Sequence, residues 1–211
     1  GADAFLKHDI SEENIKRLID AMKAFRLLMN VNGVIAYKAC ATSAMREAKN
    51  ANIVVQKVLE ESELQIDIID GQTEAKIIAA TDLNEILDSR KIYLYVDVGG
   101  GSTEFSIFEG MNKVVSKSFK IGTVRLINNQ VNEETWIALK SWIKKKTSPY
   151  KTLTLLGSGG NINKLFKMSN KKPLSVLKLS YLEQKLQEFS DLSYEERILK
   201  LGLKPDRADV I

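Results

Sequence analysis

The sequence predicts an α/β protein in which mixed sheets are flanked by helices, and three observations support this fold class. Helical and extended hydrophobic patterns alternate over the first third of the chain. Three strand patterns joined by short turns follow at residues 91–120. Helices and one further strand make up the rest. Alternating helices and strands indicate a parallel sheet, whereas strands joined by tight turns indicate an antiparallel meander.

In the first third, a helix that runs to about residue 30 is expected, with Ser11 as its N-cap. A short buried strand is expected at 34–41, and a second helix leads from it to a strand at 66–69. A third helix is expected at 74–87. The residues expected to face inward on the first two helices are Ile15, Leu18, Ile19, Met22, Phe25, Met29, Ile53, Val54 and Val58.

The second part of the chain is expected to hold four strands and several helices. The strands are expected at 91–98, 103–109, 113–120 and 153–156, and the helices at 123–130, at 132–146 and from about 162. Trp136, Leu139 and Ile143 are expected to face inward. Ser193 and Pro205 are expected to begin helices near the end of the sequence.

The composition is ordinary for a globular protein, with 44% hydrophobic and 27% charged residues among 211 and a net charge of +4. This charge mildly favours a polyanionic ligand and does not argue for nucleic acid. The single cysteine, Cys40, excludes an intrachain disulfide and is expected to be a small buried hydrophobe. One cysteine and one histidine cannot form a zinc site, so any metal must use oxygen ligands, as Mg²⁺ does. The sequence shows no membrane span and no signal peptide, so a cytoplasmic location is expected.

The segment at 97–104 reads Asp-Val-Gly-Gly-Gly-Ser-Thr-Glu and follows an apolar strand. Successive glycines let the backbone approach an anion closely, and their amide groups can surround phosphate oxygens. The residues expected to bind phosphate here are Gly99, Gly100, Gly101, Ser102 and Thr103. Asp97 and Glu104 flank them and are suited to holding a partly hydrated Mg²⁺. The alternative for this segment is a glycine-rich hairpin turn with solvated acids.

Two further strand-to-helix junctions are candidates for anion binding. Ser158, Gly159 and Gly160 form a second glycine loop, where a phosphate would meet the amide groups at the start of a helix. At 41–48, Thr42 or Ser43 can cap a helix, while Arg46 lies one turn into it and could contact an anion. A plain helix cap and a surface arginine explain the second junction equally well.

Glu74 lies in the first turn of a helix, directly after a strand. A carboxylate at this position can act as a general base that orients a water molecule for attack on phosphorus. The helix dipole favours an acid there in any case, so the position alone does not establish catalysis.

Six motifs in this order resemble the exopolyphosphatase/guanosine pentaphosphatase family, a branch of the actin-like superfamily. They are the segments 41–48, 71–75, 97–104, 122–126, 157–160 and 203–209, which together span nearly the whole chain. The resemblance implies that the chain hydrolyses terminal phosphoanhydride bonds of inorganic polyphosphate or guanosine pentaphosphate. It also implies a homodimer as the expected assembly, because family members often pair.

The resemblance assigns roles to individual residues. Glu74 matches the catalytic base, although Thr73 stands where the family usually has a second glutamate. Asp97 and Glu104 match acids that hold Mg²⁺ or position the attacking water. The positions close to bound phosphate are those of Arg46, Thr123 and Arg207.

The family fold implies two ribonuclease-H-like lobes with a cleft between them. Residues 1–80 are expected to be the remainder of the first lobe, and residues 81–211 a second lobe that ends within its last helix. The family's opening Asp-x-Gly-Ser-Asn loop does not occur in this sequence, so the first lobe is expected to be incomplete.

Two alternatives to hydrolysis stay open from the residues. One is a regulatory module that binds polyphosphate or guanosine pentaphosphate without hydrolysing it. The other is a small-molecule kinase of the same superfamily, in which the second glycine loop would bind ATP.

Overall fold

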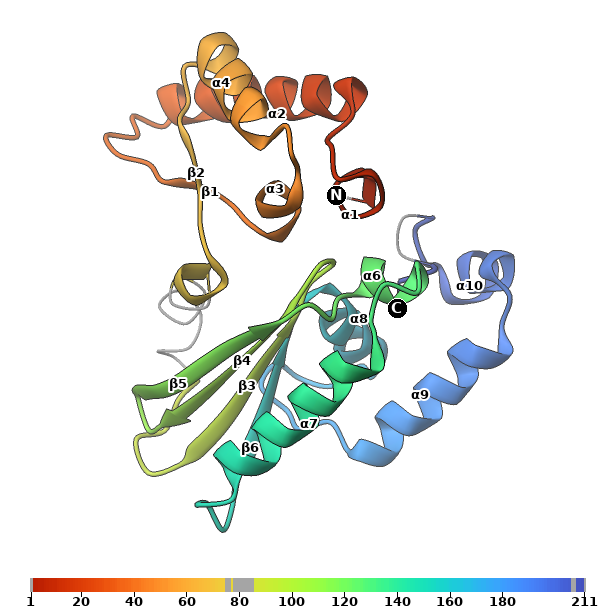
Figure 1. Cartoon of the computed structure of the whole chain (residues 1–211). Coiled ribbons are helices and arrows are strands. Elements are labelled where there is room, and N and C mark those ends of the chain that lie inside the picture. Colours follow the sequence, from red (N-terminus) through yellow and green to blue (C-terminus); the bar gives the residue numbers. More distant parts are fainter. Residues whose placement is uncertain (1, 75–76, 78–85, 206–207, 211) are drawn as a thin grey trace. The chain divides into compact units, whose positions relative to one another are not determined.

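The structure, a computed structural model, describes residues 2–74, 77, 86–205 and 208–210. Its elements are α1 (Ala2–Lys7), α2 (Glu12–Val31), β1 (Ala39–Ala41), α3 (Ser43–Glu47), α4 (Ala51–Ser62), β2 (Ile66–Ile68), β3 (Ile92–Val98), β4 (Thr103–Glu109), β5 (Asn112–Phe119), α6 (Thr123–Ile127), α7 (Glu133–Thr147), β6 (Thr154–Ser158), α8 (Gly160–Met168), α9 (Leu179–Asp191) and α10 (Tyr194–Leu201) (Figure 1). The α/β class with mixed sheets is confirmed.

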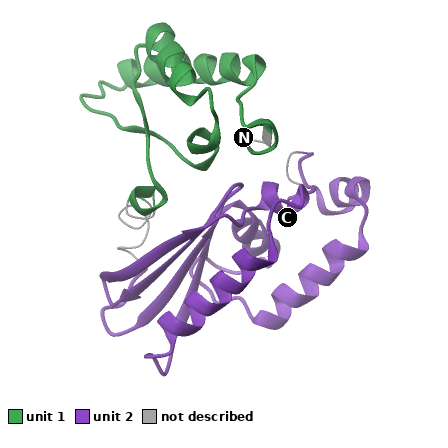
Figure 2. Ribbon diagram, viewed as in Figure 1, with its two compact units in different colours: residues 1–77 green, residues 78–211 purple. Residues whose placement is uncertain are grey.

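The chain divides into two compact units, residues 1–77 and 78–211 (Figure 2). We call them unit 1 and unit 2. The boundary expected between residues 80 and 81 falls within 78–85, outside the described residues. Most of the helix expected at 74–87 falls there too.

Unit 1 packs α2 and α4 together over a parallel pair of short strands. Cys40 of β1 lies opposite Asp67 of β2 in the parallel register. Ser11 caps α2 by accepting a hydrogen bond from the amide of Asn14 at 3.4 Å, so this predicted helix start is confirmed. The core of the unit is formed by Ala4, Ile15, Ile19, Met22, Met45, Ala48, Ala51, Val54, Val58, Leu64 and Ile66.

Two helix positions in unit 1 differ from the prediction. Phe25 is 57% exposed, because it lies to the side of the buried stripe of α2, about 60° around the helix from the buried Met22. Ile53 is 59% exposed for the same geometrical reason, since its neighbour Val54 takes the inward position on α4. The other predicted inward positions of these helices are buried or packed against the core, namely Ile15, Leu18, Ile19, Met22, Met29, Val54 and Val58.

The strand expected at 34–41 is also shorter than predicted. Only Ala39–Ala41 pairs with another strand among the described residues, and Val34 and Ile35 are exposed. Cys40 is exposed rather than buried, because its side chain lies on the face of the β1–β2 pair that α2 and α4 do not cover. Apolar composition alone therefore overestimated both the length and the burial of this strand.

Unit 2 is built on a four-stranded mixed sheet in the order β5-β4-β3-β6. Strands β3, β4 and β5 form the predicted antiparallel meander, and β6 adds to β3 in parallel. Gly110 turns the chain between β4 and β5 with a positive φ of 58°. The parallel pairing of β3 with β6 places the segments that follow these two strands at the same end of the sheet.

Side chains on both faces of this sheet are packed. Helix α7 covers one face, where Trp142 contacts the rings of Phe105 and Phe119 (Figure 1). Tyr93, Tyr95 and Phe108 form a cluster on the other face. Leu139 is buried as predicted, and Ile143 packs against the same hydrophobic cluster. Trp136, at the start of α7, was also expected to face inward but is 37% exposed.

The last helices of unit 2 pack on α8. Phe189, Leu203 and Ala208 are buried against Leu165 and Met168. Ser193 begins α10 with a complete capping box, as its position predicted. Residues 205 and 208–210 lie in turns, so the described part of the segment after Pro205 does not form the helix that was expected.

Candidate functional site

The glycine loop after β3 is held by the segment that follows β5. Among its residues, the carbonyl of Gly99 accepts a hydrogen bond from the amide of Thr123 at 3.0 Å, and the carbonyl of Gly100 accepts one from Val124 at 2.9 Å. The carbonyl of Gly101 accepts a hydrogen bond from Nε of Arg125 at 2.6 Å. Three successive carbonyls of the loop therefore point to three successive residues at the start of α6.

The position of Gly122 makes this approach sterically possible. A Cβ atom built on Gly122 would overlap the carbonyl oxygen of Gly100 and the carbonyl carbon of Gly101. The φ of Gly122 is −146°, which any residue can adopt, so the requirement for glycine is one of space. The loop and the start of α6 thus depend on the absence of a side chain at residue 122.

The hydroxyl groups of the loop are used inside the protein. Ser102 Oγ donates to Oε1 of Glu104 at 2.6 Å, and Thr103 Oγ1 donates to the carbonyl of Ile121 at 2.5 Å. Both residues are buried. Each hydroxyl has one proton to donate, so in this arrangement the backbone amides, and not these hydroxyls, are the loop's donors toward an anion.

A polar row crosses the end of the sheet on one face. Glu104 lies directly opposite Ser118 of β5 and Asp97 of β3, and Asp97 lies opposite Ser158 of β6. Directly opposed residues point to the same face of a sheet, so these four side chains form one row. Two predicted metal ligands and one predicted phosphate ligand are therefore neighbours across three strands.

Glu104 is the buried member of this row, with 3% of its surface exposed. Its Oε1 accepts hydrogen bonds from Ser102 Oγ at 2.6 Å and from Ser118 Oγ at 2.8 Å. Two hydroxyl donors on one oxygen fix the orientation of this carboxylate. The sequence did not single out Ser118, because its place beside Glu104 depends on the strand register.

The second glycine loop lies against the first. Gly159 has a φ of +107°, which L-residues with side chains rarely adopt, and a Cβ there would lie 2.5 Å from the carbonyl oxygen of Val98. The same Cβ would lie 3.2 Å from Oδ1 of Asp97. Helix α8 begins at the next residue, Gly160. The backbone of this loop therefore borders the acid of the first one.

Unit 1 brings together two other predicted site residues. Arg46 Nη1 donates to Oε2 of Glu74 at 2.9 Å and to the carbonyl of Ile69 at 2.6 Å. Both charged side chains are largely buried, with 24% of Arg46 and 15% of Glu74 exposed. Arg46 thus links the end of the β2 segment to the predicted base.

The remaining predicted residues have less defined surroundings. Thr42 is the N-cap of α3 by position, but its side chain makes no capping hydrogen bond, and Ser43 is the first residue of that helix. Thr123 contributes its amide to the loop, as described above. Arg207 falls outside the described residues. Sequence reasoning also missed Arg125, although it is part of the quoted motif at 122–126.

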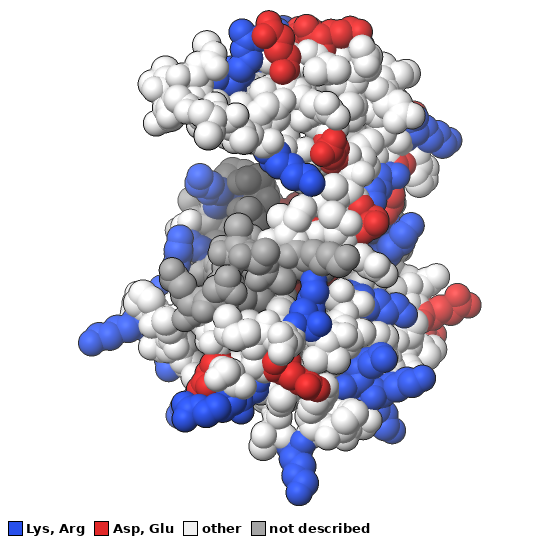
Figure 3. Space-filling model, turned by 90° about the vertical axis from the view of Figure 1, so that its left-hand side faces the viewer, with Lys and Arg blue, Asp and Glu red and all other residues white. Residues whose placement is uncertain are grey.

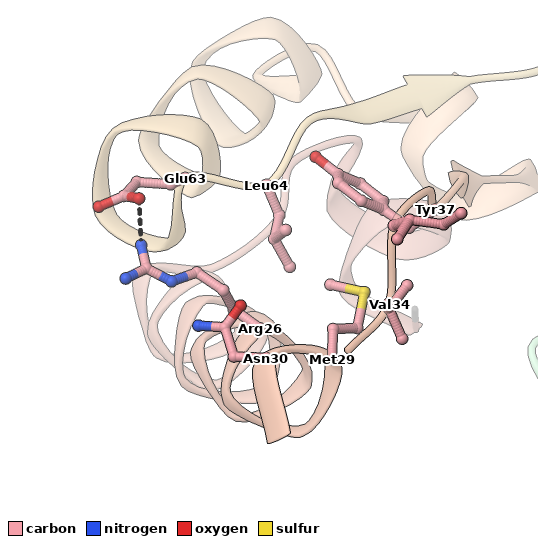
Figure 4. A pocket seen from close by; sticks show the side chains of 8 residues that line it. Arg26, Met29, Asn30, Val34, Tyr37, Glu63 and Leu64 are labelled. Carbon is pink, nitrogen blue, oxygen red and sulfur yellow. Dashed lines mark ion pairs between the residues drawn. The ribbon is translucent and has the colours of Figure 1, made fainter. Parts of the chain in front are cut away.

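The pocket in Figure 4 lies in unit 1, and none of the predicted site residues lines it. It has a volume of about 340 Å³ and is lined by Met29, Val34, Tyr37 and Leu64 among others. Its charged lining residues, Arg26 and Glu63, form an ion pair with each other at 2.5 Å. A pocket whose cationic side chain is already paired with a carboxylate is poorly suited to a polyanion.

The comparisons with known proteins agree with these motifs. Residues 5–211 match the Ppx/GppA phosphatase family. The chain belongs to this family. Two solved structures of similar fold are an exopolyphosphatase from Cytophaga hutchinsonii (TM-score 0.80, 24% identity, covering 97% of this chain and 72% of that one) and the Aquifex aeolicus Ppx/GppA protein (TM-score 0.72, 25% identity, covering 99% and 73%).

Curated relatives of this Ppx/GppA chain are longer proteins. A bifunctional 3-dehydroquinate synthase/phosphatase of Fusobacterium nucleatum is 30% identical over 240 residues, covering 100% of this chain and 35% of the relative. A guanosine-5'-triphosphate,3'-diphosphate pyrophosphatase of Photobacterium profundum is 33% identical over 118 residues, covering 56% of this chain and 24% of the relative. The chain therefore spans about a third of the first relative and about a quarter of the second.

Among the described residues, no helix combines the length and the apolarity that crossing a membrane requires. The described part of the chain also contains no cluster of three or more His, Cys, Asp or Glu residues that could hold a metal by themselves. Asp97 and Glu104, which the sequence predicts as metal ligands, stay a prediction.

Proposed function

We propose that this protein hydrolyses the terminal phosphoanhydride bonds of inorganic polyphosphate, guanosine pentaphosphate or both. The observation that carries the proposal is the convergence of two glycine loops and two carboxylates at one end of the unit 2 sheet. Backbone amides bind phosphate oxygens, and carboxylates beside them can hold a cation that bridges to the phosphate. Few other ligand classes would use both groups together.

The donor set fits Mg²⁺. Mg²⁺ keeps several water molecules and usually takes one or two carboxylates together with substrate phosphate oxygens. Asp97 and Glu104 are direct cross-strand neighbours, and Ser118 and Ser102 orient the Glu104 carboxylate. When bound, Mg²⁺ would neutralise charge that develops on the phosphate oxygens during the reaction.

In the proposed reaction, the residues of this chain bind the terminal phosphoryl group and activate a water molecule. The amides of Gly100, Gly101 and Ser102 bind the phosphoryl oxygens, whereas the amide of Gly99 donates to the carbonyl of Ser102 within the loop. Glu74 accepts the proton of the attacking water as the phosphorus–oxygen bond forms, and the bridging bond to the rest of the chain of phosphates breaks. Arg46 holds the Glu74 carboxylate in a fixed orientation through the 2.9 Å contact.

The comparisons and the charge distribution support this substrate class. Proteins similar to this chain are named as an exopolyphosphatase and as a guanosine-5'-triphosphate,3'-diphosphate pyrophosphatase. Within unit 2, Lys and Arg outnumber Asp and Glu, whereas the reverse holds in unit 1. The face drawn in Figure 3 likewise shows more basic than acidic side chains on unit 2. A basic surface raises the local concentration of a polyanion.

The test is phosphate release by the full-length protein with Mg²⁺, measured side by side on long-chain polyphosphate and on guanosine pentaphosphate. Release of inorganic phosphate from either substrate supports the proposal. Measurable binding without release would instead support the regulatory module. Phosphate transfer from ATP to a small molecule would support the kinase. We also propose a homodimer, on the resemblance given above, and a cytoplasmic location.

A further inference from the structure

The orientation of the glycine loop can be read from its three carbonyl contacts. The chain has no cis peptide bond among its described residues, so the N–H of each of these peptides points opposite to its C=O. The carbonyls of Gly99, Gly100 and Gly101 point toward residues 123–125. The amides of Gly100, Gly101 and Ser102 therefore point away from α6, as a set of three neighbouring donors.

The three peptides are held by two different kinds of group. The first two carbonyls accept from backbone amides of Thr123 and Val124, which do not depend on the identity of either side chain. The third accepts from a side chain, through Nε of Arg125 at 2.6 Å. Of the three peptides, only the one between Gly101 and Ser102 is therefore held by a side chain, so a substitution of Arg125 can free it to rotate.

The side chain of Arg125 is buried beside the glycine loop. It is 7% exposed, on the five-residue helix α6, and its neighbours Ile121 and Gly122 are buried as well. Its hydrogen-bonding Nε is directed at the protein backbone. A guanidinium that served mainly as a phosphate ligand would present its two terminal nitrogens and an open approach to the anion.

We propose that Arg125 is a positioning residue for the phosphate loop: it holds the carbonyl of Gly101 and so directs the amide of Ser102 at the bound phosphoryl group. This inference rests on the proposed function, because it assigns the geometry of the same site. It adds a residue that acts through the backbone and does not itself touch the substrate.

Three substitutions separate positioning from charge. Arg125→Gln removes the charge but keeps an N–H donor the same number of bonds from the backbone as Nε. Arg125→Lys keeps the charge but has a methylene at that position. Arg125→Met removes the charge and the donor while keeping a similar length. Arg197→Met is the matched control. Nε of Arg197, on α10, also donates to backbone carbonyls, those of Phe189 in α9 and of Leu192 directly after it.

The experiment measures kcat and KM for phosphate release from polyphosphate, together with the thermal unfolding temperature, for the full-length protein and these variants. Loss of one preorganised donor to the transition state lowers kcat by about 10²-fold, which is expected for Arg125→Met and Arg125→Lys. Arg125→Gln should stay within about tenfold of wild type, because a neutral hydrogen bond replaces a charged one. Arg197→Met should lower the unfolding temperature and leave kcat unchanged.

Several outcomes would overturn the inference. Higher activity of Arg125→Lys than of Arg125→Gln would mean that the charge acts on the substrate directly. Wild-type kcat in Arg125→Met would mean that the contact does not matter. If Arg125→Met does not fold, the test rests on the other two variants: positioning predicts a higher kcat for Arg125→Gln than for Arg125→Lys, and the reverse order overturns it. If wild-type protein releases no phosphate, the proposed function fails, and calorimetric binding of inorganic tripolyphosphate to the same variants tests the positioning separately.

Discussion

Glu74 and Arg46 form an ion pair at 2.9 Å in which the guanidinium also donates to the carbonyl of Ile69. Two residues that the sequence assigned to different tasks, a base and a phosphate ligand, are therefore in direct contact within unit 1. The second contact anchors Arg46 to the backbone, so the pair is a fixed geometry and not a chance surface pair. Its consequence for catalysis is testable on each partner.

Glu74→Gln should abolish phosphate release and leave substrate binding nearly unchanged. The oxygen of the new amide side chain can still accept from Arg46, so the fold is retained, but an amide cannot take the proton of the attacking water. Loss of a general base lowers kcat by about 10²–10⁴-fold. Steady-state kinetics and calorimetry measure both quantities. Glu61→Gln is the control, because Glu61 pairs with Lys23 on the surface of unit 1.

Arg46→Gln should reduce kcat more than it weakens substrate binding. The substitution removes the donor that orients Glu74, and a base displaced by about 1 Å can lose roughly 10²-fold in rate. A rise in KM of similar size with unchanged kcat would contradict this, and would indicate that Arg46 contacts the phosphate instead. Arg17→Gln, on the exposed face of α2, provides the reference for loss of one positive charge.

Ser118→Ala should raise the Mg²⁺ concentration needed for half-maximal activity. Ser118 donates to Oε1 of Glu104, and loss of a group that orients a metal ligand typically costs about 10–100-fold in metal affinity. Titration of activity with Mg²⁺ measures this shift. Ser116→Ala on the same strand face should leave it unchanged, since Ser116 lies opposite Ser106. Equal titration curves for both variants would remove Ser118 from the site.

Gly122→Ala should displace the glycine loop, because the new methyl group would overlap the carbonyl of Gly100. Activity is expected to fall by about 10²-fold, since the phosphate-binding amides move with that carbonyl. Gly202→Ala is the contrasting variant. Gly202 has φ +59° and nothing within 4 Å, so strain alone should cost about 1 kcal/mol of stability without loss of kcat. Wild-type activity in Gly122→Ala would show that the loop adapts.

The stability of unit 1 should depend on Asp3 in a pH-dependent way. Although partial burial opposes the shift, hydrogen bonds from Ser11 and Asn14 hold the pKa of Asp3 well below its ordinary value. A depressed folded-state pKa gives stabilisation that is present above the unfolded-state pKa of 3.8 and is lost as the pH falls toward the folded-state value. Asp3→Ala should cost roughly 1 kcal/mol at pH 7, as for loss of a helix cap, and less at pH 3.

Thermal unfolding of Asp3→Ala and wild type at pH 7, 5, 4 and 3 measures this difference. Asp9→Ala is the control, because Asp9 is exposed in the neighbouring bend. A difference between wild type and Asp3→Ala that stays constant down to pH 3 would contradict the account.

The sequence predicted the elements of unit 2 well, because its strands are long, apolar and separated by glycine turns. It predicted the glycine loops for the same reason, since Gly99–Gly101 and Gly159 follow apolar strands directly. It failed where burial depends on the packing partner. Phe25 and Ile53 have the right hydrophobicity but lie to the side of the buried stripes of their helices.

The parts of the site that sequence reasoning missed depend on register. The pairing of β4 with β5 shifts by one residue between Ile107 and Phe108, and this shift places Ser118 opposite Glu104. The sequence carries no signal for it. Arg125 belongs to the motif at 122–126, but its contact with Gly101 requires α6 to begin directly beside the loop. The neighbouring Gly122 was the available signal, because a glycine after an apolar strand often marks a close approach of two backbones.

The central claim is that the two glycine loops and the carboxylates around them hydrolyse phosphoanhydride bonds. Its most direct test is phosphate release from polyphosphate and guanosine pentaphosphate by the full-length wild-type protein and by Asp97→Asn, with Mg²⁺. The account predicts release by the wild type from at least one substrate and a loss of about 10²-fold or more in Asp97→Asn. No release by folded wild-type protein, or equal release by both proteins, would contradict it.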